Sequence, residues 1–404
     1  MQNSPSSPSL IEARPAPPPK RSTFSLRSNQ VRGLIYQVLA LSLIIFMVWF
    51  LITNTLDNMR SRGIQSGFDF LMQPAGFDIG EDWIGYDSNN GYWKAFLVGL
   101  VNTLRVAIIG IVLTTVLGTL LGIGRFSRNA LIRGLCYCYV ECFRNIPVLL
   151  QLLMWYLIFT EYLPQISQAW NVGNLLFLSK NGISFPSLVW ATGHTLALVG
   201  IGCGAIAAYV YAGRARKVFE DTGKLKPVLW TTLALMAGGA LAGWLAGGAP
   251  WQWEIPKMTE VQVEGGGALT PEYLAVLIGL VLYTSAFVAE VVRGGIASVS
   301  LGQHEASASL GLSRSHSMRL VVLPQALRVI IPPMTNQFLN LTKNSSLAVA
   351  VGYPDLVSIA NTSLNQTGRA VECIAIIMAI YLTTSLLTSG FMNWFNARAA
   401  IKER

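Results

Sequence analysis

The chain has 404 residues, of which 52% are hydrophobic and only 12% are charged, and its formal net charge at pH 7 is +9. Soluble domains carry about 25% charged residues, so this composition excludes an ordinary soluble protein and favours an integral membrane protein. The sequence contains neither aromatic–basic interleaving nor zinc-type spacing. We therefore expect no nucleic-acid partner.

All five cysteines fall in apolar segments; they are Cys136, Cys138, Cys142, Cys203 and Cys373. The first two are one residue apart and have no histidine nearby, a spacing that does not fit a metal site. We interpret the cysteines as small helix-packing residues, and we expect neither a metal site nor catalytic residues.

The N-terminal region differs in composition from the rest of the chain. Residues 1–33 are rich in Ser and Pro and carry several Arg and Lys, which predicts a disordered basic tail in the cytoplasm. Residues 34–53 are apolar over about 20 positions, the length that spans a bilayer. The acidic, aromatic stretch 54–94 follows, and we predict that it packs as an extracytoplasmic cap.

Hydropathy predicts an all-α integral membrane protein with about eight transmembrane helices. We place them at 34–53, 95–124, 134–162, 188–212, 227–247, 272–292, 327–351 and 371–395. Basic loops alternate with acidic ones along this series, so both termini, including the basic tail 397–404, are expected to be cytoplasmic. The helix at 227–247 is rich in Gly and Ala, which close helix packing in lipid favours.

A long polar loop separates the sixth and seventh predicted helices. Ser300 and Gln303 form a capping-box pattern that predicts a helix start. Glu305 then lies near the positive end of the helix dipole, and Gly311 suits a left-handed residue at the helix end. An amphipathic helix on the membrane surface is the alternative interpretation of this loop.

The same loop resembles a motif of the permease subunits of bacterial ATP-driven importers. The family pattern is E-A-A-x3-G-x9-I-x-L-P, with Ser307 and Val321 as conservative replacements here. The matching residues are Glu305, Ala306, Ser307, Gly311, Leu323 and Pro324. In that family the loop forms a coupling helix that docks on a cytoplasmic ATPase, and the resemblance implies that role for these residues.

Further segments resemble the histidine/glutamine type of amino-acid permease. They include Val140–Gln151, with Ile146 in place of the usual Thr, Ala289–Ile296, Leu323–Arg328 and Lys343–Leu347. The resemblance covers about 95–160 and 272–396, which implies a type I importer core of five helices inside a permease domain at 95–396. The N-terminal helix and a hairpin at about 188–247 are additions, and this enlarged layout resembles the Q-type permease of general L-amino-acid importers of Gram-negative bacteria.

The resemblance implies a permease subunit that translocates polar or general L-amino acids across the bacterial inner membrane. The chain has no P-loop, because Gly223-Lys224 lacks the upstream Gly and the following Ser or Thr. The implied partners are therefore an ATP-binding subunit dimer, a second and related permease, a periplasmic amino-acid-binding protein and membrane lipid, with no cofactor on this chain. An ATP-independent secondary transporter or channel is the alternative, and it requires internal inverted repeats. A membrane scaffold is a third interpretation, which the coupling motif opposes.

The seventh predicted helix carries a polar stripe. Asn336, Asn340 and Asn344 recur at helical spacing on one face, and we expect Pro332-Pro333 to kink the helix just before them. We hypothesise that this face lines the translocation path and that Lys343 meets a substrate carboxylate. The alternatives are hydrogen bonding between helices for the stripe and snorkelling to the outer surface for the lysine.

Three further charges fall in apolar helices, where they need partners. Glu141 and Arg144 are three residues apart and so could pair with each other, with Pro147 loosening the helix one turn later. Either they contribute to the substrate path or they hold the helix near the cytoplasmic surface. Arg105 is a lone cation for which the sequence names no partner.

Overall fold

The computed structural model describes residues 29–61, 63, 66–224, 226–259 and 263–399. Most of the predicted tail 1–33 and residues 400–404 of the predicted tail 397–404 lie outside these described residues. The chain divides into two compact units, residues 1–67 and residues 68–404. The structure is mostly helical, as the composition predicts.

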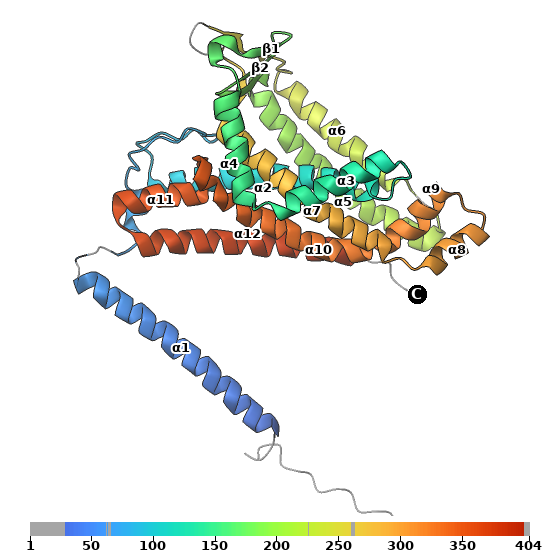
Figure 1. Ribbon diagram of the computed structural model, residues 1–404, viewed down its shortest axis with the longest axis horizontal. Coiled ribbons are helices and arrows are strands. Elements are labelled where there is room, and N and C mark those ends of the chain that lie inside the picture. Colours follow the sequence, from blue (N-terminus) through green and yellow to red (C-terminus); the bar gives the residue numbers. More distant parts are fainter. Residues whose placement is uncertain (1–28, 62, 64–65, 225, 260–262, 400–404) are drawn as a thin grey trace, which may run out of the picture. The chain divides into compact units, whose positions relative to one another are not determined.

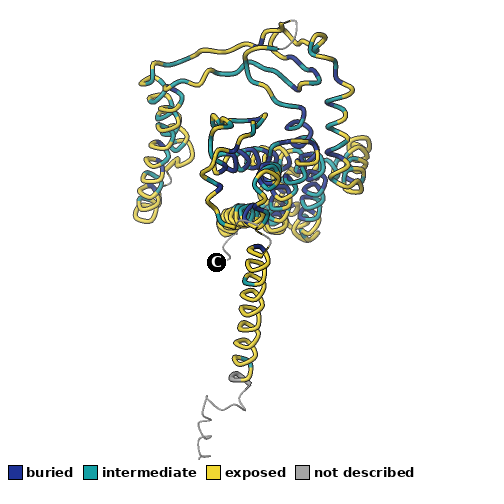
Figure 2. Tube along the Cα trace, turned by 90° about the vertical axis from the view of Figure 1, so that its left-hand side faces the viewer, coloured by how far each residue is buried: buried dark blue, intermediate teal, exposed yellow. Residues whose placement is uncertain are grey.

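The first unit contains one long helix, α1 (Asn29–Ser61). Its segment Arg32–Ser61 is long and apolar enough to cross a membrane, and it extends beyond the predicted span 34–53 at both ends. Figure 2 shows α1 exposed along its length, whereas buried residues concentrate within the helical bundle of the second unit.

The second unit contains the remaining helices. They are α2 (Tyr92–Gly124), α3 (Ala130–Asn145), α4 (Val148–Leu157), α5 (Thr192–Thr222), α6 (Val228–Ala246), α7 (Pro271–Ala297), α8 (Leu301–Ser309), α9 (Arg314–Ser317), α10 (Leu323–Asn344), α11 (Leu356–Thr367) and α12 (Ala370–Ala399). Short 3-10 segments occupy Asp69–Met72, Ile166–Gln168 and Ser345–Val351, and π-helical turns occupy Ile158–Tyr162 and Met318–Val322.

Helices α2, α7, α10 and α12 pack together as a bundle (Figure 1). Glycines bring α2 and α7 close, because a Cβ on Gly118 would lie 2.5 Å from Cγ1 of Val288 and one on Gly122 would lie 2.8 Å from the backbone oxygen of Ala289. Helices α8 and α9 lie at one end of this bundle and α11 lies at the other (Figure 1). We call these the α8 end and the α11 end.

The predicted helix at 134–162 is wrong as a single element, because it is broken into α3 and α4 with a bend of 103°. The break falls at Ile146 and Pro147, and Ile146 is extended, with φ −100° and ψ 127°. A proline lacks the N–H that helix continuation needs and disfavours helical geometry in the residue before it. The expected loosening at Pro147 is thus a full break, and it precedes the proline.

Among the described residues, six helices are long and apolar enough to cross a membrane, or seven if α3 and α4 together count as one span. The predicted span that is not among them is the seventh, 327–351, which corresponds to α10 and the following segment Ser345–Val351. Its polar stripe explains why α10 does not pass as a span by composition alone. Pro332 and Pro333 lie inside α10, and the helix continues through both.

The predicted loops 163–187 and 248–271 contain short strands that we did not expect. They are β1 (Trp170–Val172), β2 (Leu176–Ser179), β3 (Gly182–Phe185), β4 (Ser187–Leu188), β5 (Trp253–Glu254), β6 (Lys257–Met258), β7 (Val263–Glu264) and β8 (Gly267–Leu269). Four of them form an antiparallel sheet in the order β1-β2-β3-β8. Ser179 pairs with Gly182 and Ile183 pairs with Leu269, so the sheet ties the two loops together. The remaining strands form the pairs β4–β5 and β6–β7.

Helices α5 and α6 form the predicted hairpin. A Cβ on Gly200 would lie 2.0 Å from the backbone oxygen of Gly239, and one on Gly243 would lie 2.1 Å from that of Leu196. Small residues permit this contact between backbones, which is how helices associate in lipid, where the hydrophobic effect gives no drive.

The segment 68–91 packs on the α11 end of the bundle, as expected for a cap. Phe70 is buried beside Tyr92 of α2, with ring centroids 5.5 Å apart. Asp69 pairs at 3.1 Å with the buried Arg369, which lies between α11 and α12. The hydroxyl of Tyr92 donates a hydrogen bond of 2.8 Å to Gln366 of α11. The first two contacts fix the segment to α2 and to the connection between α11 and α12, and the third joins α2 to α11.

Candidate coupling loop and polar helix face

The motif-bearing loop folds into the short helices α8 and α9. Helix α8 begins directly after Ser300, as predicted, and ends at a left-handed glycine, Gly311, with φ +71°. The N–H of Gly311 donates to Ala308 and that of Leu312 donates to Ser307, at 2.9 Å and 3.1 Å. This pair of bonds satisfies carbonyls that the helix end would otherwise leave free.

The predicted capping box does not form. The side chain of Ser300 makes no capping hydrogen bond, and Gln303 instead accepts a bond of 3.0 Å from the side-chain amide of Gln325 in α10. Glu305 lies in the second turn of α8, one turn later than the dipole argument favours. Gln303 therefore bonds a residue of α10 instead of capping the start of α8.

Ser307 holds α8 and α9 together. It is only 3% exposed, and its hydroxyl lies 2.6 Å from that of the buried Ser317 while donating to the carbonyl of His304 at 2.8 Å. The replacement of alanine by serine in the motif is thus matched by a second serine ten residues later in the chain. The alanine pattern alone does not reveal this pair.

No described part of the chain covers the outward surface of α8. Glu305, Ala306 and Gly311 are exposed, and Leu310 is 80% exposed. A large apolar side chain on the surface of a short, slim helix is suited to a groove on another protein.

Leu323 and Pro324 do not belong to this exposed surface. They lie at the start of α10, which continues directly from the π-helical turn Met318–Val322. The structure therefore separates the predicted coupling residues into a group on α8 and a pair at the start of α10.

The predicted polar stripe lies on an uncovered face of α10. Asn336, Asn340 and Lys343 are exposed and Asn344 is partly buried, whereas Phe338 and Leu341 on the opposite face are buried. Within the part of the chain that the structure describes, the side chains of these four polar residues have no hydrogen-bonding partner. Interhelical bonding within this chain therefore does not explain the stripe.

The expected pair between Glu141 and Arg144 is absent among the described ion pairs. Arg144 lies instead 4.0 Å from Glu290 of α7 and 5.4 Å from the ring centroid of Phe287. The backbone oxygen of Glu141 accepts a bond of 2.7 Å from Asn145. Arg144 thus stands in the last turn of α3, directly before the break.

The break is stabilised by a buried amide. Gln151 of α4 donates from Nε2 to the carbonyls of Phe143 and Ile146, at 2.9 Å and 2.8 Å. These carbonyls lost their helical partners when α3 ended. Non-helical backbone within a membrane is stable only where protein groups or the water of a cavity satisfy its hydrogen bonds.

Sequence reasoning missed two charge clusters. Arg105 pairs at 2.8 Å with Glu81 and lies between the rings of Trp83 and Tyr273, 4.1 Å and 3.9 Å from their centroids. Burial raises the pKa of Glu81, and its contacts with Thr270 and Arg105 oppose that shift. The second cluster surrounds Glu290. The only local signal for either cluster is an unpaired charge in an apolar segment.

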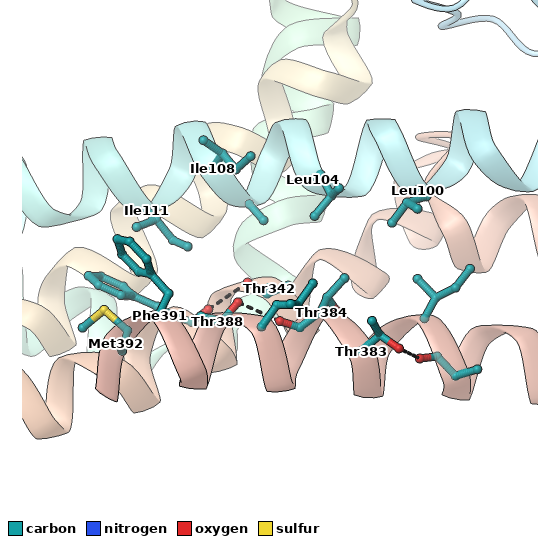
Figure 3. A pocket seen from close by; sticks show the side chains of 15 residues that line it. Leu100, Leu104, Ile108, Ile111, Thr342, Thr383, Thr384, Thr388, Phe391 and Met392 are labelled. Atoms are coloured by element: carbon teal, nitrogen blue, oxygen red, sulfur yellow. Dashed lines mark hydrogen bonds between the residues drawn. The ribbon is translucent and has the colours of Figure 1, made fainter. Parts of the chain in front are cut away.

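Two pockets differ in character. A groove of about 620 Å³ between α2, α10 and α12 is lined almost entirely by hydrocarbon (Figure 3). The hydroxyls of Thr384 and Thr388 donate back to their own helix, so this groove offers little to a polar substrate. A pocket of about 420 Å³ at the α11 end includes the carboxylates of Asp78, Glu81 and Glu272.

Comparison with known proteins identifies the family. Residues 110–401 match the binding-protein-dependent transport system inner membrane component. The chain is 43% identical over 373 residues to the general L-amino acid transport system permease protein AapQ of Rhizobium johnstonii, covering 92% of this chain and 93% of that protein. It is 44% identical over 388 residues to the putative amino-acid ABC transporter permease protein YhdX of Escherichia coli, covering 95% and 98%.

A third relative is named for a narrower set of substrates. The chain is 36% identical over 424 residues to the glutamate/glutamine/aspartate/asparagine transport system permease protein BztB of Rhodobacter capsulatus, covering 96% of this chain and 99% of that protein. The matches extend over nearly the whole length of all three relatives, and all three are transport permeases. The chain belongs to the family of membrane-embedded inner membrane components of binding-protein-dependent transport systems.

Proposed function

We propose that this chain is the permease subunit of an amino-acid importer of the general L-amino-acid type, driven by ATP hydrolysis on a partner subunit. The exposed surface of α8 carries this proposal. It is a short helix with a defined end at Gly311 and an uncovered Leu310, at the end of the bundle and outside the candidate membrane spans. A groove on a cytoplasmic ATP-binding subunit is the occupant that this surface suits.

The names of the three relatives support amino acids as substrates. Two refer to amino acids in general or to general L-amino acids, and the third refers to glutamate, glutamine, aspartate and asparagine. We infer a broad range that includes acidic and amide side chains. Selection among them is shared with a periplasmic binding protein.

The distribution of charge supports an orientation with the α8 end in the cytoplasm. Arg293, Arg314 and Arg319 lie in or beside the coupling loop, and Arg128 and Arg133 lie between or at the ends of α2 and α3. The cap at the α11 end then faces the periplasm with its acidic pocket, where it is placed to meet the binding protein. Both chain termini are cytoplasmic in this arrangement.

The polar face of α10 supports a path shared with a second permease chain. Asn336, Asn340 and Lys343 are exposed, yet lipid is a poor environment for such side chains. A related permease facing this surface encloses a polar channel between the two chains. The α3–α4 break adds Arg144 to the same function, because broken helices in membranes can line cavities.

Co-purification tests the coupling role directly. The tagged chain is expressed with its ATP-binding subunit, partner permease and binding protein, and the ATP-binding subunit is quantified after purification from detergent. Gly311→Asp places a side chain where φ is +71°, and we expect it to release the ATP-binding subunit. Gly302→Asp adds the same charge to α8 at an open position with an ordinary backbone, and it should retain the subunit.

Equal retention by the two variants would contradict docking through α8. Stable transport activity without any ATP-binding subunit would favour the ATP-independent transporter instead.

A further inference from the structure

Glu290 of α7 stands at the centre of three guanidinium groups. Its Oε2 lies 2.5 Å from Nη1 of Arg125 and 4.0 Å from Nη1 of Arg144. Its Oε1 accepts from Arg293 at 2.5 Å, and Nε of Arg293 lies 3.0 Å and 3.1 Å from the two carboxylate oxygens. One carboxylate therefore contacts cations that belong to three different helical segments.

Each cation marks a separate structural element. Arg125 directly follows the last residue of α2, and Arg144 is in the last turn of α3, two residues before the break. Arg293 is on α7 itself, four residues before that helix ends. Three residues separate the end of α7 from the start of the coupling helix α8. Glu290 thus links the segment that leads into α8 with the α3–α4 break.

Close packing at this level makes the link mechanical as well as electrostatic. A Cβ on Gly124 would lie 2.5 Å from Sγ of Cys136, and one on Gly295 would lie 2.3 Å from Cγ1 of Ile330. Helices α2, α3, α7 and α10 therefore leave little room for independent displacement near Glu290. A shift of the inner part of α7 displaces its neighbours unless their contacts break.

The charges of the cluster do not balance. One carboxylate faces three guanidinium groups, and Arg144 and Arg293 remain 35% and 38% exposed. The contact with Arg144 is also the longest of the set. In such a cluster the carboxylate can exchange one arginine partner for another as the helices shift. A buried pair with a single partner on each side has only one arrangement.

We propose that Glu290 is a positioning residue that transmits displacement of the coupling loop to the break between α3 and α4. This inference rests on the proposed function, in which α8 is moved by the ATP-binding subunit. Glu290 contacts neither ATP nor substrate in this scheme. It makes Arg144 and the start of α4 move together with the C-terminal end of α7.

The number of substrate molecules transported per ATP distinguishes this role from a merely structural one. A residue needed only for folding lowers ATP hydrolysis and uptake together, through the amount of intact complex. A transmitting residue leaves ATP hydrolysis in place and lowers uptake per ATP. Coupling free energies between sites correspond to changes of about 5- to 150-fold.

The experiment uses the whole transporter in proteoliposomes, with ATP hydrolysis and uptake of labelled glutamate and glutamine measured on the same preparation. For Glu290→Gln we expect unchanged co-purification of the ATP-binding subunit, ATP hydrolysis within about twofold of wild type and uptake per ATP lowered by about tenfold. Glu290→Asp keeps the carboxylate and should restore most of the coupling.

Glu220→Gln is the matched control. It removes an exposed carboxylate that pairs with Arg216 at 3.1 Å on α5, away from the cluster. Uptake and ATP hydrolysis by this variant should equal those of wild type. If Glu290→Gln does not accumulate in membranes, Arg125→Gln decides the question by the same criteria, because it removes the closest contact between α2 and Glu290.

Unchanged uptake per ATP in Glu290→Gln, or a parallel fall in uptake and ATP hydrolysis that Glu290→Asp does not relieve, would overturn the inference. Neither outcome affects the proposed function as long as wild-type chain supports ATP-driven uptake. If wild-type chain supports none, the proposed function fails first, and the inference falls with it.

Discussion

The two ends of the helical bundle each hold an arginine against a glutamate, but in different surroundings. At the α11 end, Arg105 and Glu81 are 11% and 7% exposed, and two aromatic rings enclose the guanidinium. At the α8 end, Glu290 is 29% exposed and is shared among three arginines. In the first cluster one cation pairs with one carboxylate and both are largely buried, whereas in the second one carboxylate is shared among three more exposed cations.

This difference separates a fixed part of the molecule from a part suited to movement. A buried pair with one partner each is strongly destabilised when either member is lost, so it holds the cap on the bundle. An open cluster with several partners loses little when one contact is exchanged. We therefore expect the α11 end to behave as a rigid frame and the α8 end to rearrange during transport.

The largest expected effect comes from breaking the buried ion pair between Arg105 and Glu81. Arg105→Leu leaves the Glu81 carboxylate buried without its cation, which costs about 3–5 kcal/mol of stability. The measurement is the midpoint temperature of thermal unfolding in detergent, monitored by tryptophan fluorescence. The double variant Glu81→Leu/Arg105→Leu removes both charges and should recover most of the loss. A double variant as unstable as Arg105→Leu would contradict the ion-pair account.

The α3–α4 break lies between the two ends and should respond less strongly. Gln151→Leu leaves the carbonyls of Phe143 and Ile146 without donors, at a cost of about 1–3 kcal/mol. We expect a lower thermal midpoint and faster proteolysis near the break. Gln325→Leu removes an amide whose partner, Gln303, is exposed, so water replaces the bond and the midpoint should hardly change. Equal effects of the two variants would show that the buried amide does not stabilise the break.

The open end can be loosened without touching any neighbour. Gly311→Ala meets no atom within 4 Å but forces a side chain into a left-handed backbone, with φ +71°, at a cost of about 1–2 kcal/mol. Hydrogen exchange of α8 amides should accelerate by about tenfold. Gly302→Ala lies at an equally open position in the same helix without that backbone constraint, and its exchange should be unchanged or slower. An acceleration in both variants would argue against a specific role for the helix end.

A pH-dependent effect is expected at Asp355, which caps α11 by accepting a hydrogen bond of 2.8 Å from the N–H of Ser358. Burial raises the pKa of Asp355 to about 7, above the value of about 3.9 for an unfolded chain. Its contribution to stability is therefore greatest below about pH 4 and is lost as the pH rises through about 7.

The test of this effect is the thermal midpoint of wild type and Asp355→Asn from about pH 5 to about pH 8. Asparagine keeps the cap acceptor and has no charge to desolvate. The fall in midpoint with rising pH should be shallower in the variant. Parallel curves for the two proteins would place the pH dependence on other groups.

The sequence predicts those features that depend on local pattern. Apolar runs locate the long helices, the spacing of Asn336 and Asn340 indicates one exposed face, and the glycine at Gly311 marks a left-handed helix end. Each of these is set by periodicity or by the backbone freedom of a single residue.

Features that depend on distant partners were missed or misassigned. The side chain of Gln303 bonds Gln325 instead of capping its own helix, and Arg144 faces Glu290 instead of Glu141. The partner of Arg105 lies in the cap, 24 positions earlier in the chain. Pro147 indicates an irregular helix, but the 103° bend also depends on the buried Gln151, which donates hydrogen bonds to the carbonyls that the break leaves without helical partners.

The most direct measurement of the central claim is ATP-driven uptake of labelled glutamate, glutamine and a neutral amino acid by the reconstituted transporter. Wild-type chain and Gly302→Asp should take up all three substrates when ATP is present, and Gly311→Asp should take up none of them. Normal uptake by Gly311→Asp, or uptake by wild type that does not require ATP, would contradict the account of this chain as a permease coupled through α8.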